Sequence, residues 1–202
     1  MHQKETALLG RIVAETAHDL NNVLAVTRDA GGLLQDILSK INLENLPHAD
    51  KLTRIGESID RQTQRGAEAA KALNRFAHLT DAPLAKIDIA TMVLLALTLT
   101  KRHAAQRQTV ISSTSLVNKQ TISGPPMQTL LTISACLRAC IDACPNGNVE
   151  ISTKKARHGA EIRFSLQKRE ADVVADLSPE SLHELGAHFS QTDNLAVLLL
   201  NP

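Results

Sequence analysis

Aromatic side chains are almost absent from this chain. Its 202 residues include three Phe and no Trp or Tyr, so it has no set of flat rings on which nucleic-acid bases could stack. The formal net charge is only +1, which leaves no basic excess to displace counterions from a phosphate backbone. The composition therefore argues against a nucleic-acid binder. It predicts a core of Leu, Ile, Val and Ala, which suits helix bundles.

Long hydrophobic runs are also missing. The longest apolar stretch, Ile87–Leu99, contains Asp88 and is shorter than the roughly 20 residues that a membrane-spanning helix needs. Met1–Glu5 leads directly into an amphipathic pattern rather than into a signal peptide. We therefore expect no membrane association and a cytoplasmic location.

Cysteine is scarce as well. Cys136, Cys140 and Cys144 are four residues apart, so they share one face of a predicted helix. They could in principle hold a metal ion, but no histidine lies close in sequence to complete a tetrahedral set. We expect the three thiols to pack as small apolar side chains in a reducing compartment, and we expect no metal site.

The most informative stretch is the pentapeptide His18-Asp19-Leu20-Asn21-Asn22, inside a long predicted helix. Asn22 lies one helical turn after His18 on the same face, and Asp19 flanks the imidazole. A neutral imidazole nitrogen is a nucleophile near neutral pH, and a neighbouring carboxylate can hold the ring in one tautomer. His18, Asp19 and Asn22 are therefore the candidate catalytic residues of a histidine that accepts a phosphoryl group. The alternative is a polar patch on a solvated helix face.

This run resembles the phosphoacceptor box of bacterial sensor histidine kinases, in particular its His-Asp-Phe-Asn-Asn-Leu-Leu form. The resemblance implies that His18 is the phosphorylated residue and that Asp19 is the acidic residue beside it. It also implies that Asn22 takes the Thr or Asn position that helps to dephosphorylate a partner response regulator. Val23 departs from the pattern, because many of these kinases have a proline there.

Apolar residues at helical spacing predict two long helices, about Glu5–Lys40 and Ala49–Leu79, joined by a turn over Asn42–His48. Two such helices cannot bury their apolar stripes against each other alone. A second copy would complete a four-helix bundle, so we expect residues 1–80 to form a homodimeric hairpin. The resemblance implies the same, namely a dimerization and histidine-phosphotransfer domain. The alternative is a monomer whose hairpin docks on the second domain. The expected stripe of the first helix comprises Leu9, Ile12, Val13, Thr16, Leu20, Val23, Leu24, Thr27, Leu34, Ile37, Leu38 and Ile41.

Asp81-Ala82-Pro83 marks a domain boundary, because Pro83 cannot continue the helix. Residues 83–202 alternate between helical and strand-like patterns, so we expect an α/β sandwich with one sheet and helices on one face. The whole chain is then α+β. The predicted helices are Asp88–Arg102, with room to extend to Gln106, then Pro125–Cys144 and a short one beginning at Ser178. The predicted strands are Gln108–Ser113, Lys119–Ser123, Val149–Ile151, Ile162–Leu166 and Leu195–Leu200.

This order of elements resembles the ATP-binding domain of histidine kinases, and Ile141–Ile151 looks like the end of its asparagine-bearing helix with the strand that follows. The resemblance implies asparagines that hold magnesium and the phosphates, but Ala135 and Ala139 stand at those positions, and alanine offers no oxygen ligand. An Asp-x-Gly-x-Gly loop is also expected, whereas Leu166 leads into Gln167-Lys168-Arg169-Glu170, and no P-loop occurs. We therefore predict a degenerate domain that has lost ATP, in a chain with no cofactor of its own.

Two classes of function remain. In the first, the chain is a histidine phosphotransferase of a two-component phosphorelay, which passes a phosphoryl group between His18 and receiver-domain aspartates. Magnesium is then expected only in the partner receiver domain. In the second, the chain is a non-catalytic pseudokinase that binds receiver domains or kinases as a scaffold. A complete His-Asp-x-x-Asn set without ATP machinery favours transfer over a scaffold or an active kinase.

Partner choice is expected to depend on surface side chains beside His18 on the first helix and on the facing part of the second. The candidate partner-binding residues are Arg11, Glu15, Ala25, Arg28, Arg65 and Glu68.

Overall fold

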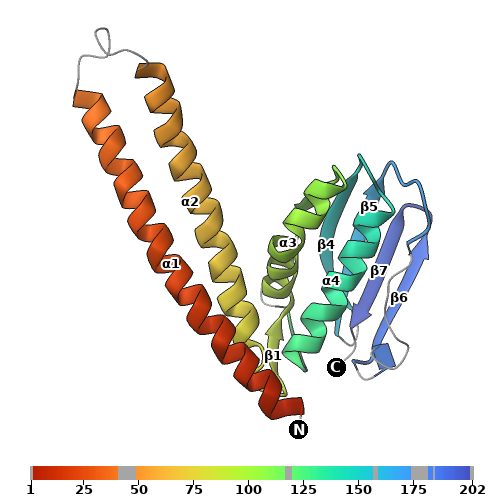
Figure 1. Ribbon diagram of the computed structural model, residues 1–202. Coiled ribbons are helices and arrows are strands. Elements are labelled where there is room, and N and C mark those ends of the chain that lie inside the picture. Colours follow the sequence, from red (N-terminus) through yellow and green to blue (C-terminus); the bar gives the residue numbers. More distant parts are fainter. Residues whose placement is uncertain are drawn as a thin grey trace. The chain divides into compact units, whose positions relative to one another are not determined.

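The computed structural model (Figure 1) describes residues 2–40, 49–116, 120–156, 159–173, 182–183 and 185–200, and the side chains of residues 13, 17–40 and 50 onward within those ranges. The chain is α+β, as predicted. It divides into two compact units, Met1–His78 and Leu79–Pro202. Over the ranges given, no helix combines the length and the hydropathy that crossing a lipid bilayer requires.

The first unit is an antiparallel pair of helices, α1 (His2–Lys40) and α2 (Ala49–His78) (Figure 1). The predicted helical hairpin is therefore confirmed. The turn expected over Asn42–His48 lies outside the described residues.

Glycines let these two helices approach closely. A Cβ atom at Gly66 would lie 2.8 Å from Cδ2 of Leu24, and one at Gly31 would lie 2.8 Å from Cγ2 of Ile59. Each glycine thus leaves room for a branched side chain of the other helix. The two contacts are seven residues apart on both helices, which is about two helical turns, so they fix one antiparallel register. Gly32 has open space around it and has no such role.

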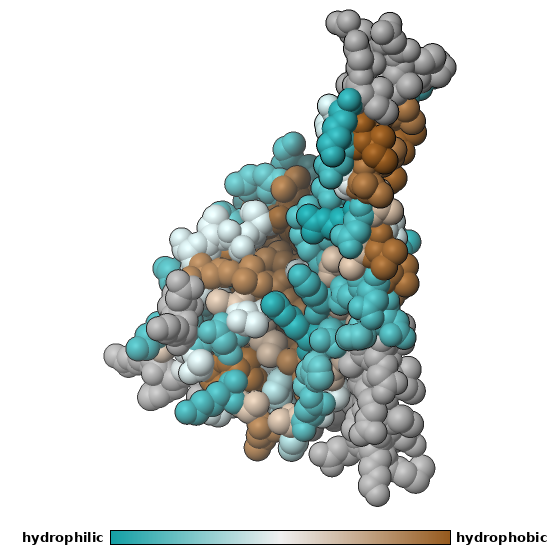
Figure 2. All heavy atoms as spheres, turned by 90° about the vertical axis from the view of Figure 1, so that its left-hand side faces the viewer, coloured by the Kyte–Doolittle hydropathy of each residue, from teal (hydrophilic) through white to brown (hydrophobic). Residues whose placement is uncertain are grey.

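The hairpin leaves part of its apolar surface exposed. Ala17 and Leu38 are buried, since they lie on the side of α1 that faces α2. Other apolar residues of α1 are largely exposed, and hydrophobic atoms run along the upper part of the hairpin in Figure 2. This agrees with the expectation that two helices alone cannot bury both stripes. The exposed residues and their exposed fractions are Leu20 (46%), Val23 (62%), Val26 (70%), Leu33 (60%) and Ile37 (48%).

The second unit contains a five-stranded sheet covered on one face by two helices (Figure 1). In spatial order the strands are β2 (Val110–Ser113), β4 (Asn148–Ala156), β5 (Gly159–Gln167), β7 (Leu195–Leu200) and β6 (Ala187–Thr192). The pair β2–β4 is parallel and the other pairs are antiparallel. The helices are α3 (Ile89–Gln106) and α4 (Pro126–Asp142).

The core of this unit follows from strand alternation. Every second residue is buried along β5 and β7 and along β4 as far as Thr153, among them Ile151, Phe164 and Leu198. Leu130 and Ile133 of α4 are equally buried. The core is mainly aliphatic, as the composition predicts, and it also contains Phe164, Met92 and the three cysteines.

Local signals fix where the two helices begin. The carboxylate of Asp88 accepts a hydrogen bond from the Thr91 backbone N–H at 2.8 Å, which caps α3. Pro126 occupies the first turn of α4, where its missing N–H costs no helical hydrogen bond. The predicted starts near residues 88 and 125 agree with these positions.

Part of the strand prediction is wrong. The strands β1 (Ala85–Asp88) and β6 were not predicted, and β3 (Thr121–Gly124) pairs with β1 in a separate two-stranded sheet rather than joining the main one. Ile87, the first residue of the long apolar run, lies opposite Ile122 in this small sheet. Pairing between segments distant in sequence decides these strands. The helix expected at Ser178 lies outside the described residues.

The three cysteines are free and fully buried on α4 and just after it, as predicted. Burial in an apolar environment raises the pKa of the Cys136 thiol from 9.0 to about 12. The pKa values of Cys140 and Cys144 are also raised, chiefly by burial. These thiols are protonated and inert at neutral pH.

Candidate functional site

The side chain of His18 projects into solvent from α1. Its exposed fraction is 75%, and that of the adjacent Asp19 is 85%. Ala17, one residue earlier, is fully buried. Successive residues of a helix point about 100° apart, so neighbours can differ in exposure. The fold thus anchors the helix on one side and presents the imidazole on another.

One nitrogen of this imidazole has neighbours within α1. The Nδ2 atom of Asn22 lies 3.4 Å from Nδ1 of His18, which is within hydrogen-bond reach. An Asp19 carboxylate oxygen lies 3.8 Å from the same nitrogen, too far for a direct hydrogen bond but close enough for electrostatic attraction. Nε2 of His18 forms no hydrogen bond with any residue that the structure describes. The predicted triad therefore gathers around Nδ1 and leaves Nε2 accessible.

The carboxamide of Asn22 can stabilise either neutral tautomer of His18. With its nitrogen toward Nδ1, as placed, Nδ1 accepts and the ring proton lies on Nε2. A 180° rotation of the amide presents its oxygen instead, and Nδ1 then carries the proton. In that second tautomer Nε2 carries no proton, so its lone pair is free. The Asp19 carboxylate favours the same tautomer, because a proton on Nδ1 brings positive charge toward it.

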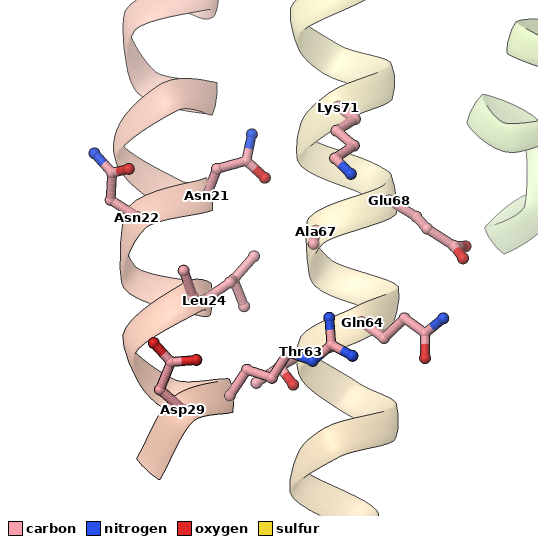
Figure 3. Close-up of a pocket in the computed structure, with 11 residues that line it drawn as sticks. Asn21, Asn22, Leu24, Asp29, Thr63, Gln64, Ala67, Glu68 and Lys71 are labelled. Carbon is pink, nitrogen blue, oxygen red and sulfur yellow. The ribbon is translucent and has the colours of Figure 1, made fainter. Parts of the chain in front are cut away.

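A groove of about 670 Å³ runs between α1 and α2 next to this triad (Figure 3). Asn21 and Leu24 point from α1 toward α2, whereas Gln64 and Glu68 point away from α1 in this view. The lining residues are Asn21, Asn22, Leu24, Ala25, Arg28, Asp29, Thr63, Gln64, Ala67, Glu68 and Lys71.

One ion pair crosses the hairpin at this groove. Nε of Arg28 donates to Oδ1 of Asp60 at 3.2 Å, and the two side chains are 59% and 44% exposed. At that exposure the pair contributes at most about 1 kcal/mol to stability. Its main effect is to hold the guanidinium of Arg28 against α2. Asp29 and Lys71 form no ion pair with any described residue.

The predicted partner-binding residues are only partly brought together. Ala25, Arg28 and Glu68 line the groove. Arg65 is exposed but does not line it, and the side chains of Arg11 and Glu15 lie outside the described part of the chain.

Sequence reasoning missed Asn21, Gln64 and Lys71. The sequence could have indicated Gln64 and Lys71, because they lie four residues before and three residues after the predicted Glu68 and so share its helix face. Asn21 likewise precedes Ala25 by one turn. What the sequence could not show is which part of α2 faces His18.

The second unit was expected to retain a fold without its nucleotide ligands. On α4, Ala135 is half-buried and Ala139 is 8% exposed. The segment after β5 contacts the end of α4, since the Glu170 backbone N–H donates to the Ala143 carbonyl at 2.8 Å. Nη1 of Arg169 donates to the Asp193 carbonyl at 2.8 Å. Both hydrogen bonds involve the segment where the resemblance implied the Asp-x-Gly-x-Gly loop.

No protein family model and no curated protein matches the chain. Solved structures similar to it include the catalytic domain of histidine kinase ThkA, with a TM-score of 0.48 at 6% identity over 59% of this chain and 97% of that one. Acinetobacter baumannii histidine kinase AdeS has a TM-score of 0.48 at 10% identity, covering 89% of this chain and 95% of that one. The ATP-binding domain of PrrB from Mycobacterium tuberculosis has a TM-score of 0.47 at 16% identity, over 60% and 98% of the two chains.

Proposed function

We propose that this chain is a histidine phosphotransferase of a two-component phosphorelay. His18 takes a phosphoryl group from the aspartate of a phosphorylated receiver domain and passes it to another receiver. The observation that carries the proposal is the arrangement of the imidazole. Nδ1 is engaged by Asn22 within α1, while Nε2 is left without a described hydrogen-bond partner on an exposed side chain.

The transfer itself needs little covalent machinery from this chain. The Nε2 lone pair of His18 attacks phosphorus, the bond from phosphorus to the aspartate oxygen breaks, and its electron pair returns to the receiver carboxylate. The Nδ1 proton then passes to Asp19 or to water. We expect the magnesium that neutralises the phosphoryl oxygens to come with the receiver domain, so the chain needs no cofactor of its own.

The groove beside His18 supports docking of the receiver domain. It begins at Asn22, one turn from the imidazole, and continues over Ala25 and Arg28. Glu68 contributes from α2. Arg65, Arg11 and Glu15 stay candidates for partner contact. A receiver bound there would lie next to the phosphoryl-accepting nitrogen.

The second unit is proposed to lack kinase activity. Ala135 and Ala139 offer no oxygen to magnesium, and Arg169 and Glu170 are bonded to the protein's own backbone. The phosphoryl group on His18 therefore comes from another protein rather than from ATP.

The exposed apolar residues of α1 support a homodimer. Val26, Leu33 and Ile37 follow seven- and four-residue steps, the spacing by which helices pack side by side in bundles. A second copy of the hairpin would bury this stripe and complete four helices.

The decisive test of this function uses receiver domains whose aspartate carries a radiolabelled phosphoryl group. The wild-type protein should gain acid-labile label from at least one of them, and His18→Gln should gain none. Because His18 is exposed, this substitution should change the free energy of unfolding by no more than about 0.5 kcal/mol. A folded His18→Gln protein that still gains label would place the reaction on another histidine. Receivers that bind the wild-type protein without ever labelling it would make the chain a scaffold.

A further inference from the structure

The lysine at position 71 lies closer to His18 than its sequence position suggests. Leu24 packs against Gly66, and the antiparallel register is the same two turns further on, where Gly31 meets Ile59. Continuing five residues beyond Gly66 along α2 reaches Lys71. Five residues back from Leu24 along α1 is Asp19. Lys71 is therefore level with the residue next to His18.

The side chain of Lys71 lies on the groove side of α2. It is one of the groove-lining residues together with Asn21 and Asn22, and Asn22 is the residue that contacts His18. In Figure 3, Asn21 from α1 and Lys71 from α2 extend to the same level of the groove. Lys71 therefore lines the same groove as the residue that contacts His18.

No carboxylate neutralises this ammonium group among the residues that the structure describes. Glu68, three residues earlier, points away from α1 in Figure 3, and Asp29 lies further along the groove on α1. The other cation of the groove, Arg28, is bound to Asp60 at 3.2 Å. Lys71 is the groove cation that keeps its charge unpaired within the described chain.

We propose that Lys71 is the cationic residue of the phosphotransfer site, which contacts the phosphoryl oxygens as the group moves between the receiver aspartate and Nε2 of His18. This inference rests on the proposed function. The transferring group carries negative charge over three oxygens in the transition state, and a nearby ammonium stabilises that charge. The chain has no kinase machinery to supply a metal of its own, so a built-in cation is suited to this task.

The test compares Lys71→Ala and Lys71→Arg with the wild-type protein, and Lys51→Ala serves as a matched control because Lys51 is exposed near the far end of the same helix. Two phosphoryl donors are used, a phosphorylated receiver domain over a range of concentrations and the small donor phosphoramidate. Label on His18 is followed by phosphorus NMR. Circular dichroism checks that each variant is folded.

With both donors, Lys71→Ala should lower the rate of His18 phosphorylation about tenfold, as the loss of one close charge predicts. With the receiver domain as donor, the lower rate of His18 phosphorylation should persist at saturating receiver concentration. Lys71→Arg should recover most of the rate, and Lys51→Ala should match the wild-type protein. Equal phosphoramidate rates for wild type and Lys71→Ala, or a defect seen only in the receiver concentration needed for half-saturation, would overturn the role of Lys71. Failure of every receiver to label the wild-type protein would instead overturn the proposed function.

Discussion

The two ring nitrogens of His18 have different surroundings, and we expect this difference to direct its chemistry. Nδ1 lies 3.4 Å from the Asn22 amide and 3.8 Å from an Asp19 oxygen, while Nε2 has no described partner. Attack on phosphorus at Nε2 requires the ring proton on Nδ1. Asp19 is thus positioned to favour this tautomer, and Asn22 can hydrogen-bond Nδ1 in it through its amide oxygen.

Replacing Asn22 by Ala should shift the balance between the two tautomers of His18, because Nδ1 loses its hydrogen-bond partner. We expect His18 to remain able to accept label, and the hydrolysis of the partner's phosphoaspartate to become slower. Nitrogen-15 chemical shifts of the ring measure the tautomer, and decay of the labelled receiver measures hydrolysis. Unchanged ring shifts in Asn22→Ala would show that the contact does not set the tautomer.

The triad could be predicted from sequence because all its members lie on one helix. Helical geometry alone brings residues one and four positions after His18 around its ring. Lys71 could not be found in this way. It comes from α2, and its level relative to His18 depends on the packing of Gly66 against Leu24, which no local pattern reveals.

The hairpin is held in register by small residues at the points where the helices meet. Gly31 accommodates Ile59, whose branched side chain has little freedom to move. Gly32, the next residue, faces open space. Alanine substitutions at these two adjacent positions are therefore expected to change the stability of the hairpin in opposite directions.

Gly32→Ala should stabilise the hairpin by about 0.5–1 kcal/mol, because alanine is the better helix former and nothing obstructs its Cβ. Gly31→Ala should lose that gain and destabilise by about 1–3 kcal/mol, since the new Cβ would lie 2.8 Å from Ile59 Cγ2. Urea unfolding followed by circular dichroism measures both. Equal effects at the two positions would contradict the close approach at Gly31.

Cys136 and Cys140 lie on the buried face of α4 together with aliphatic residues. In the native state the pKa of Cys136 is raised from 9.0 to about 12 by burial. Above pH 9 the unfolded chain therefore loses this proton while the folded chain keeps it. Stability should be complete below pH 9 and should fall as pH rises toward about 12.

This sign predicts a specific result for Cys136→Ala. The variant should lose less stability than the wild-type protein between pH 9 and pH 11, although its stability at pH 7 is lower because a buried atom is missing. Denaturant unfolding at each pH measures the difference.

The burial of the three cysteines also predicts their reactivity. At pH 7 and without denaturant, thiol reagents should modify the wild-type protein only as fast as it unfolds. Rapid modification of the native thiols would contradict their burial.

For the chain as a whole, the sequence predicted the α+β class and the helical hairpin better than the strand pairing. Helices and strong strands such as β7 follow from local periodicity. The strands β1 and β6 do not, because β1 forms against the distant β3, and β6 is a sheet edge whose side chains are half-buried or exposed. An exposed edge strand carries little hydrophobic signal.

The exposed stripe on α1 gives a prediction for assembly. The wild-type protein should be a dimer by light scattering at tens of micromolar, because a second copy would bury the exposed stripe of Val23, Val26, Leu33 and Ile37. Val26→Glu together with Leu33→Glu should produce a folded monomer, since two charges would enter that interface. Val110→Glu is the control, because Val110 is 61% exposed on β2 of the second unit. A monomeric wild-type protein would contradict the four-helix bundle.

If this chain is a phosphotransferase, His18 receives its phosphoryl group from another protein and not from ATP. The most direct measurement incubates the wild-type protein in parallel with γ-labelled ATP and magnesium, and with receiver domains labelled on their aspartate. We predict acid-labile label on His18 from a receiver and none from ATP. Label from ATP, or none from any receiver, would contradict the claim.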